Sequence, residues 1–133
     1  MIKVYSNTFP LGAYKAMTLW PFLFIRKKAV VNGLFNEVDE RHEEIHGAQQ
    51  REMLCAGAVT AFVMAVFGFG WWSLLALPIF LWWYGIEWLI RLIQYRNGKA
   101  AYKNISFERE AYKHEREIDY ISTRKAFEWI EYI

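Results

Sequence analysis

The chain has 133 residues, which allows one domain, and its content of 55% hydrophobic and 19% aromatic residues is high for a small soluble protein. A formal net charge of +2, without a basic patch studded with aromatic residues, argues against nucleic-acid binding. The one cysteine, Cys55, excludes an intramolecular disulfide, and the N-terminus lacks the pattern of a removable signal peptide.

The N-terminal segment, residues 1–35, contains two short apolar runs. These runs, Phe22–Ile25 and Ala29–Val31, lie on either side of three basic residues. The pattern is typical of a short β-ribbon. The sequence Trp20-Pro21-Phe22 equally favours an aromatic segment that lies on a lipid interface, so both interpretations stay open. If Phe22–Ile25 is an edge strand, it could bind an extended peptide by strand addition.

A helix is predicted to follow over residues 36–67. Asn36 is a suitable N-cap, and the acidic residues directly after it suit the positive end of the helix dipole.

This helix contains the pentapeptide His42-Glu43-Glu44-Ile45-His46. Two histidines four residues apart leave the same face of a helix and can share one tetrahedral metal ion. Glu43, one step around the helix, can then reach a metal-bound water, as in H-E-x-x-H metalloproteases. The alternative is a solvated, acid-rich helix face that matches the pattern by accident.

No charged residue lies between Met53 and Ile86. This segregation of charged and apolar residues predicts a membrane protein. The run exceeds the ~20 residues of one crossing, and Gly68 and Gly70 supply a turn in its middle. We therefore predict a membrane hairpin of two transmembrane helices. The first continues the 36–67 helix, and the second covers residues 71–95 with a kink at Pro78.

The basic residues predict the topology of this hairpin. Seven Lys or Arg precede it and nine follow from Arg91, whereas the connecting turn has none. The positive-inside rule then predicts a two-pass protein of the bacterial inner membrane with both termini in the cytoplasm. His46 lies about 10 Å of helix before Met53, so the motif is expected on the cytoplasmic side.

Residues 99–133 are predicted to form cytoplasmic helices after Asn97-Gly98 ends the second crossing. Ser106 can cap one of these helices. An apolar stripe on it would pack back on the first helix. Its residues are Phe107, Ala111, His114, Ile118 and Ile121. A last short helix, Phe127–Ile133, is expected at the surface.

A catalytic zinc site usually has three protein ligands and leaves the fourth position to water. Glu87 is the sole carboxylate of the second crossing and thus a functional candidate. It is predicted to lie too deep in the membrane, where Arg91, one turn along, offers it an ordinary ion pair. Glu108 flanks the apolar stripe and is the better candidate, with Glu110 as its nearest competitor.

The segment Phe107-Glu108-Arg109-Glu110-Ala111 and the pentapeptide together resemble the motif pair of integral-membrane gluzincins, the group that contains the CAAX prenyl proteases. The resemblance covers residues 42–46 and 107–111. It implies that Glu108 is the third zinc ligand beside His42 and His46, and that Glu43 is the catalytic base. The arrangement also resembles small uncharacterised bacterial membrane proteins, a likeness that names no substrate.

The chain departs from the gluzincin group at Tyr112, because the group commonly has Asp four residues after the ligand. The side chain that orients a ligand histidine is then expected to be Asp39, Tyr112 or Glu115. Tyr112 and His114 are candidates for stabilising an oxyanion, although a histidine in a stripe position is more often packed.

We therefore expect a mainly α protein that forms a single membrane-embedded domain over residues 1–133. Its expected function is that of a Zn²⁺-dependent metallopeptidase that hydrolyses peptide bonds at the cytoplasmic membrane surface, with Glu43 as general base. Peptides or membrane proteins are the expected substrates, lipid is an expected partner, and oligomerisation would be a natural way to complete a cleft. The alternative function is a non-catalytic membrane adaptor.

Overall fold

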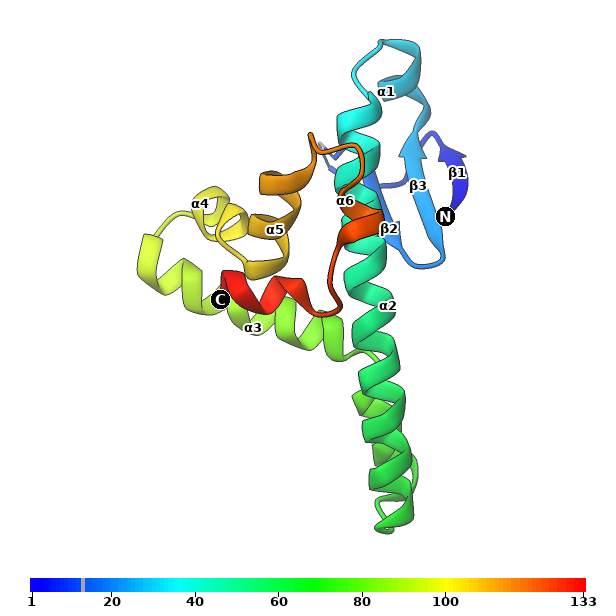
Figure 1. Cartoon of the computed structure of the whole chain (residues 1–133), viewed down its shortest axis with the longest axis vertical. Helices are drawn as coiled ribbons and strands as arrows, with labels where there is room; N and C mark the ends of the chain where they lie inside the picture. Colours follow the sequence, from blue (N-terminus) through cyan, green and yellow to red (C-terminus); the bar gives the residue numbers. More distant parts are fainter. Residues whose placement is uncertain (13) are drawn as a thin grey trace. The chain divides into compact units, whose positions relative to one another are not determined.

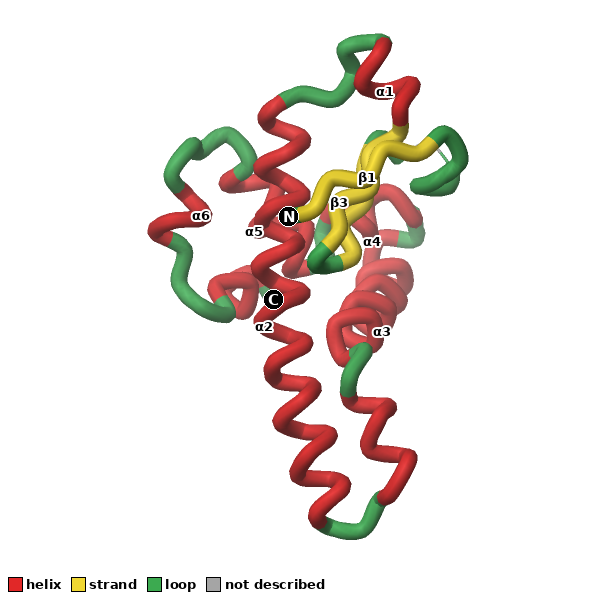
Figure 2. Tube along the Cα trace, turned by 90° about the vertical axis from the view of Figure 1, so that its right-hand side faces the viewer, coloured by secondary structure: helices red, strands yellow, loops and turns green. Residues whose placement is uncertain are grey.

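The computed structural model describes residues 1–12 and 14–133. The protein is mainly helical, as the sequence predicts, with 63% of its residues in helices, and it has a three-stranded sheet that the sequence did not predict (Figure 1, Figure 2). The strands are β1 (Ile2–Ser6), β2 (Ala16–Leu19) and β3 (Phe22–Arg26). The α-helices are α1 (Lys27–Val31), α2 (Glu37–Val66), α3 (Ile79–Tyr95), α4 (Gly98–Lys103), α5 (Ser106–His114) and α6 (Tyr120–Thr123), and the 3₁₀ helices are η1 (Gly70–Ala76) and η2 (Glu128–Tyr132).

The chain divides into two compact units. The first, which we call the sheet unit, consists of Met1–Ala48 and Glu110–Lys125. The second, the hairpin unit, consists of Gln49–Arg109 and Ala126–Ile133. The division falls within α2 and α5, and each of these helices is continuous through it.

The sheet of the sheet unit has β3 in its centre. β1 pairs with β3 in parallel and β2 pairs with it antiparallel, so that the order is β1-β3-β2. Leu23 and Ile25 of β3 are buried with Ala16 of β2, and Phe35 packs against them. Because both edges of β3 are paired, the hypothesis that Phe22–Ile25 binds a peptide as an edge strand is wrong.

The predicted ribbon is right in its first strand and wrong in its second. Phe22–Ile25 lies in β3, but Ala29–Val31 belongs to the short helix α1. Ala29 is buried, whereas Val31 is 84% exposed. The run therefore has a single side that packs against the protein and no second strand to pair with, because β1 and β2 already occupy both edges of β3.

Helix α2 begins and continues as predicted. The Asn36 side-chain oxygen accepts hydrogen bonds from the backbone N–H groups of Val38 at 2.8 Å and Asp39 at 3.1 Å. Asp39 in turn accepts one from the Asn36 N–H at 3.0 Å. This reciprocal cap satisfies N–H groups that a helix start would otherwise leave unpaired. The helix then runs without a break to Val66.

The prediction of one helix over residues 71–95 is wrong. The segment consists of η1 and α3, with a bend of 59° between them. Pro78 lies at the break, where it lacks an N–H and restricts the preceding residue, so the helix cannot continue through it. Among the described residues, no individual helix has both the length and the apolar composition of a membrane span. The bent pair of η1 and α3, taken together, has both.

In the hairpin unit, the core consists of Met53, Ile105, Phe107 and Trp129, with aromatic residues of α3 packed around it. Glu87 of α3 is 7% exposed and accepts hydrogen bonds from the Ser106 N–H at 2.9 Å and the Ser106 hydroxyl at 2.6 Å.

The predicted ion pair of Glu87 with Arg91 is present at 3.3 Å. Glu87 thus caps the start of α5, and it fixes this helix to α3.

The predicted apolar stripe of α5 holds only over its first half. Phe107 and Ala111 are fully buried, and Ala111 packs with Ile45 of α2 as expected. Helix α5 ends at His114, however, and Ile118 and Ile121 are 80% and 41% exposed. Once the helix stops, its period no longer determines which side chains point inward.

Candidate metal centre

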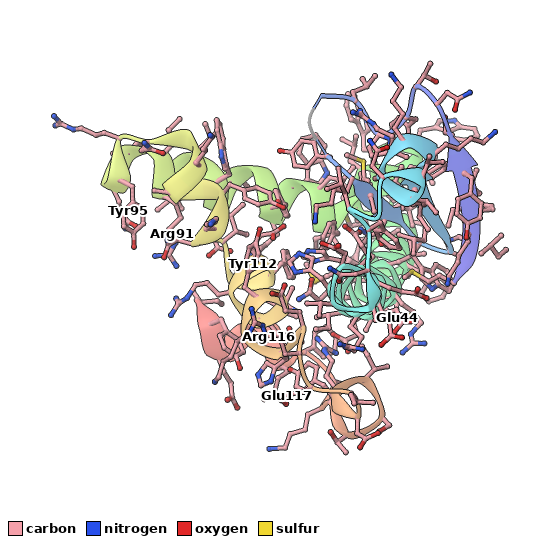
Figure 3. The ribbon with its side chains drawn as sticks, turned by 90° about the horizontal axis from the view of Figure 1, so that it is seen from above. Glu44, Arg91, Tyr95, Tyr112, Arg116 and Glu117 are labelled. Atoms are coloured by element: carbon pink, nitrogen blue, oxygen red, sulfur yellow. The ribbon has the colours of Figure 1, made fainter. Side chains whose placement is uncertain are left out.

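The two motif histidines lie on one face of α2. His42 and His46 are 9% and 7% exposed, and the His42 ring packs against Tyr112 of α5 at 4.7 Å between ring centroids. Glu44 lies on the side of α2 away from Tyr112 (Figure 3). The first glutamate of the motif, Glu43, is therefore the one that lies beside the histidine face.

The two histidine rings are hydrogen-bonded to each other through their Nε2 atoms. The Nε2 atoms of His42 and His46 are 3.1 Å apart. Two nitrogens bound to one tetrahedral zinc at their usual bond lengths are about 3.3 Å apart. The distance between these atoms is thus close to the distance between two nitrogens that share one ion.

Glu115 orients His42. Its carboxylate oxygen lies 2.9 Å from His42 Nδ1, and its backbone oxygen accepts a hydrogen bond from Arg41 Nε at 2.9 Å. A carboxylate at Nδ1 favours the tautomer with the proton on that atom, which leaves the Nε2 lone pair for a metal. Of the three partners that the sequence suggests, Glu115 has this place, while Asp39 pairs with Lys15.

Glu108 comes from the first turn of α5, where it is only 2% exposed. Its Oε1 atom accepts a hydrogen bond from the Tyr84 hydroxyl at 2.9 Å. Next to Glu108, the Gln49 side chain donates to the Phe107 carbonyl at 3.0 Å, which holds the start of α5 against α2.

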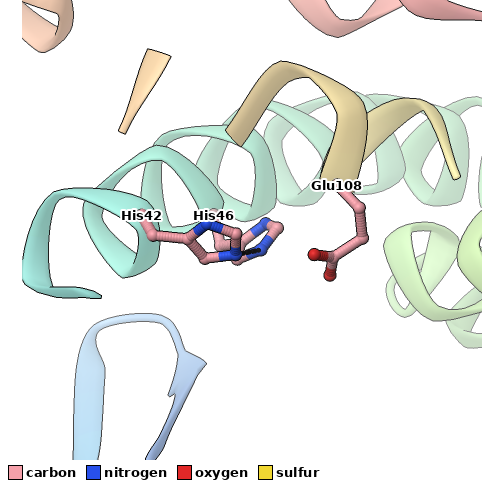
Figure 4. A group of neighbouring side chains, drawn as sticks. All are labelled: His42, His46 and Glu108. Carbon is pink, nitrogen blue, oxygen red and sulfur yellow. Dashed lines mark hydrogen bonds between the residues drawn. The ribbon is translucent and has the colours of Figure 1, made fainter. Parts of the chain in front are cut away.

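The three side chains that the sequence names as ligands come together in the structure. One ligand atom each of His42, His46 and Glu108 lies within 4.8 Å of the other two, and all three side chains are buried (Figure 4). Two imidazole nitrogens and one carboxylate oxygen form the donor set of His₂Glu zinc enzymes, which leaves one position open. The residues therefore fit a zinc ion in number and in chemistry.

Glu43 is held by a residue that the sequence did not suggest. The Thr18 hydroxyl, on edge strand β2, lies 2.8 Å from Glu43 Oε2 and 3.0 Å from the Glu43 carbonyl oxygen. Thr18 is 4% exposed. No sequence motif surrounds this threonine. It reaches Glu43 because β2, which pairs with β3, lies beside α2.

The competing carboxylate, Glu110, has another role. It is fully buried, pairs with Arg124 and accepts a hydrogen bond from the Tyr120 hydroxyl at 3.0 Å. The third histidine, His114, stacks on Tyr120 at 3.9 Å between ring centroids, as expected of a packed histidine. Of the two oxyanion candidates, Tyr112 is the one whose ring contacts a motif histidine.

The chain matches no protein-family model, no curated protein and no solved structure. The likeness to gluzincins therefore consists of the two motifs alone. What the structure adds is the grouping of the side chains that those motifs name, His42, His46 and Glu108.

Proposed function

We propose that the protein is a zinc-dependent metallopeptidase in which His42, His46 and Glu108 bind the metal and Glu43 is the general base. The observation that carries this proposal is the buried group of three ligand atoms within 4.8 Å of one another. An acid-rich, solvated helix face would match the pentapeptide, but it would not require a buried carboxylate from another helix beside both histidines.

Each side chain of the site then has a defined task. When bound, zinc acts as a Lewis acid on the attacking water and on the scissile carbonyl. Glu43 accepts the proton of that water and delivers it to the leaving amine. The Thr18 hydroxyl keeps the Glu43 carboxylate in position, and Glu115 holds the His42 ring through Nδ1, so that Nε2 would be the atom that binds the metal. Tyr112 is our candidate for stabilising the developing oxyanion.

We also propose that the protein works at the inner membrane of a bacterium, with both termini in the cytoplasm and with peptides or membrane proteins as substrates. The stretch from Met53 to Ile86 without any charge supports this proposal, as do the basic residues that flank it.

Metal removal tests the proposed chemistry. Protein purified in detergent should contain one zinc per chain by elemental analysis and should cleave members of a quenched fluorescent peptide library. A chelator should remove both the zinc and the cleavage, and added zinc should restore both. Cleavage by the metal-free protein would contradict the mechanism. Protein with neither zinc nor cleavage would favour the non-catalytic adaptor.

The Glu115→Ala variant should bind zinc about 10- to 100-fold more weakly, because His42 loses the partner that orients its ring. Competition with a chromogenic chelator measures the affinity. Glu117→Ala is the matched control, since its carboxylate bonds to His114 instead and its zinc affinity should not change. Equal affinities of both variants would exclude the orienting role of Glu115.

A further inference from the structure

The hairpin unit ends in an apolar tip formed by the end of α2, the turn and η1. Its large side chains are exposed to an extent that is unusual for a protein surface in water: Phe62 70%, Val66 69%, Phe67 77%, Trp71 87% and Trp72 71%. The tip lies within the stretch that carries no charge. It therefore suits an apolar environment on all sides.

Helix α3 has three of its polar side chains on the inside. Tyr84, Glu87 and Arg91 lie on its covered face, where they bond within the hairpin unit. The opposite face is apolar and exposed, with Trp82, Ile86, Leu89, Ile90 and Ile93. A surface helix in water shows the reverse pattern. An apolar outer face is typical of a helix that lies in a membrane interface.

The two apolar surfaces of the hairpin unit belong to one side of it. Helix α3 begins beside α2 and extends away from it, α4 lies on one side of α3, and the tip extends on the other side (Figure 1, Figure 2). The exposed face of α3 is opposite to its contacts with α4 and the start of α5, and so it faces the same way as the tip. The exposed face of α3 and the projecting tip therefore form one apolar side of the hairpin unit.

The length of the projecting tip can be measured from the point where it leaves α3. Gly57 of α2 lies there, since a side chain at this position would collide with the carbonyl oxygen of Ala76. From Gly57, α2 continues nine residues to Val66, or about 14 Å. The seven residues of η1 return over a similar distance of about 14 Å. One leaflet contributes about 15 Å to the hydrocarbon core.

We infer that the hairpin unit is embedded in a single leaflet, with its tip near the bilayer midplane and α3 lying flat below the headgroups. Three exposed basic residues follow the end of α3 and then lie beside anionic headgroups: Arg96, Lys99 and Lys103. This inference rests on the membrane part of the proposed function and not on its hydrolytic part. It differs from the two crossings expected from the sequence, because the tip does not emerge on the far side.

Cysteine accessibility in vesicles of phosphatidylcholine and phosphatidylglycerol tests the inference. In a Cys55→Ala background, Trp71→Cys at the tip should stay unlabelled by a membrane-impermeant maleimide added to either side, and it should react once detergent is added. Lys99→Cys is the matched control and should react from one side only. Labelling of Trp71→Cys from the side opposite to Lys99→Cys would overturn the inference in favour of two crossings.

A second measurement excludes a tip covered by another protein copy. Spin labels at Trp71→Cys and at Ile93→Cys of α3 should report different depths, near the midplane and near the headgroups. Equal, shallow depths would overturn the one-leaflet arrangement. Protein that does not float with the vesicles would overturn the membrane part of the proposed function as well, whereas zinc content and peptide cleavage would still decide its hydrolytic part.

Discussion

Replacement of Glu43 with Gln should abolish peptide hydrolysis and leave zinc bound. The amide has nearly the same shape as the carboxylate, and its oxygen can still accept the hydrogen bond of Thr18. It cannot accept the proton of the attacking water, and the loss of a general base costs about 10²- to 10⁴-fold in rate. Turnover of a cleavable peptide and elemental analysis of the same preparation measure the two effects.

The adjacent glutamate provides the control for this substitution. Glu44 follows Glu43 directly but lies on the side of α2 away from Tyr112. Glu44→Gln removes the same charge from the same helix turn and should change neither rate nor zinc content. A Glu43→Gln protein that cleaves at the original rate would rule out Glu43 as the base.

Substitution of His42, His46 or Glu108 with Ala should release zinc from the protein. Each change leaves two of the three ligands that lie within 4.8 Å of one another, and two protein ligands hold zinc poorly. Zinc per chain, measured after gel filtration, should fall from one to well below one in each variant, and hydrolysis should be lost with it.

Two further variants separate loss of a ligand from loss of structure. His114→Ala removes the third histidine, which stacks on Tyr120, and should retain zinc. Glu110→Ala removes the carboxylate two residues after Glu108 and should destabilise the fold, because Arg124 loses its buried partner. Its folded fraction should still bind zinc. If Glu110→Ala lost zinc while Glu108→Ala kept it, the ligand assignment would be wrong.

The parts that the sequence predicted depend on local signals. The cap at Asn36 and the continuation of α2 through Met53 follow from residues within one or two helical turns. Helix α5 does start at Ser106, but its cap is the distant Glu87 and not the Ser106 side chain. The sequence also named the three side chains that the structure groups together, His42 and His46 by their spacing and Glu108 by its resemblance to the gluzincin segment.

The parts that could not be predicted depend on contacts between distant residues. Strand β1 pairs with β3 across about twenty residues, and no short motif encodes that pairing. The position of Thr18 beside Glu43 follows from the same sheet. Around Pro78, the composition showed that the segment is apolar, but it could not tell a kinked α-helix from a 3₁₀ helix and an α-helix with a 59° bend between them.

Glu87 connects helix α3, which we infer to lie on lipid, with helix α5, which carries the proposed ligand Glu108. Its carboxylate bonds to the first residue of α5, and Glu108 follows two residues later on the same helix turn. We expect a tilt of α3 to move Glu108, the proposed metal ligand, because buried hydrogen bonds connect α3 to the start of α5 and to Glu108 itself. If α3 rests on lipid as we infer, delipidation should weaken zinc binding at the proposed site, and the amount of phospholipid retained during purification should then change the measured zinc content.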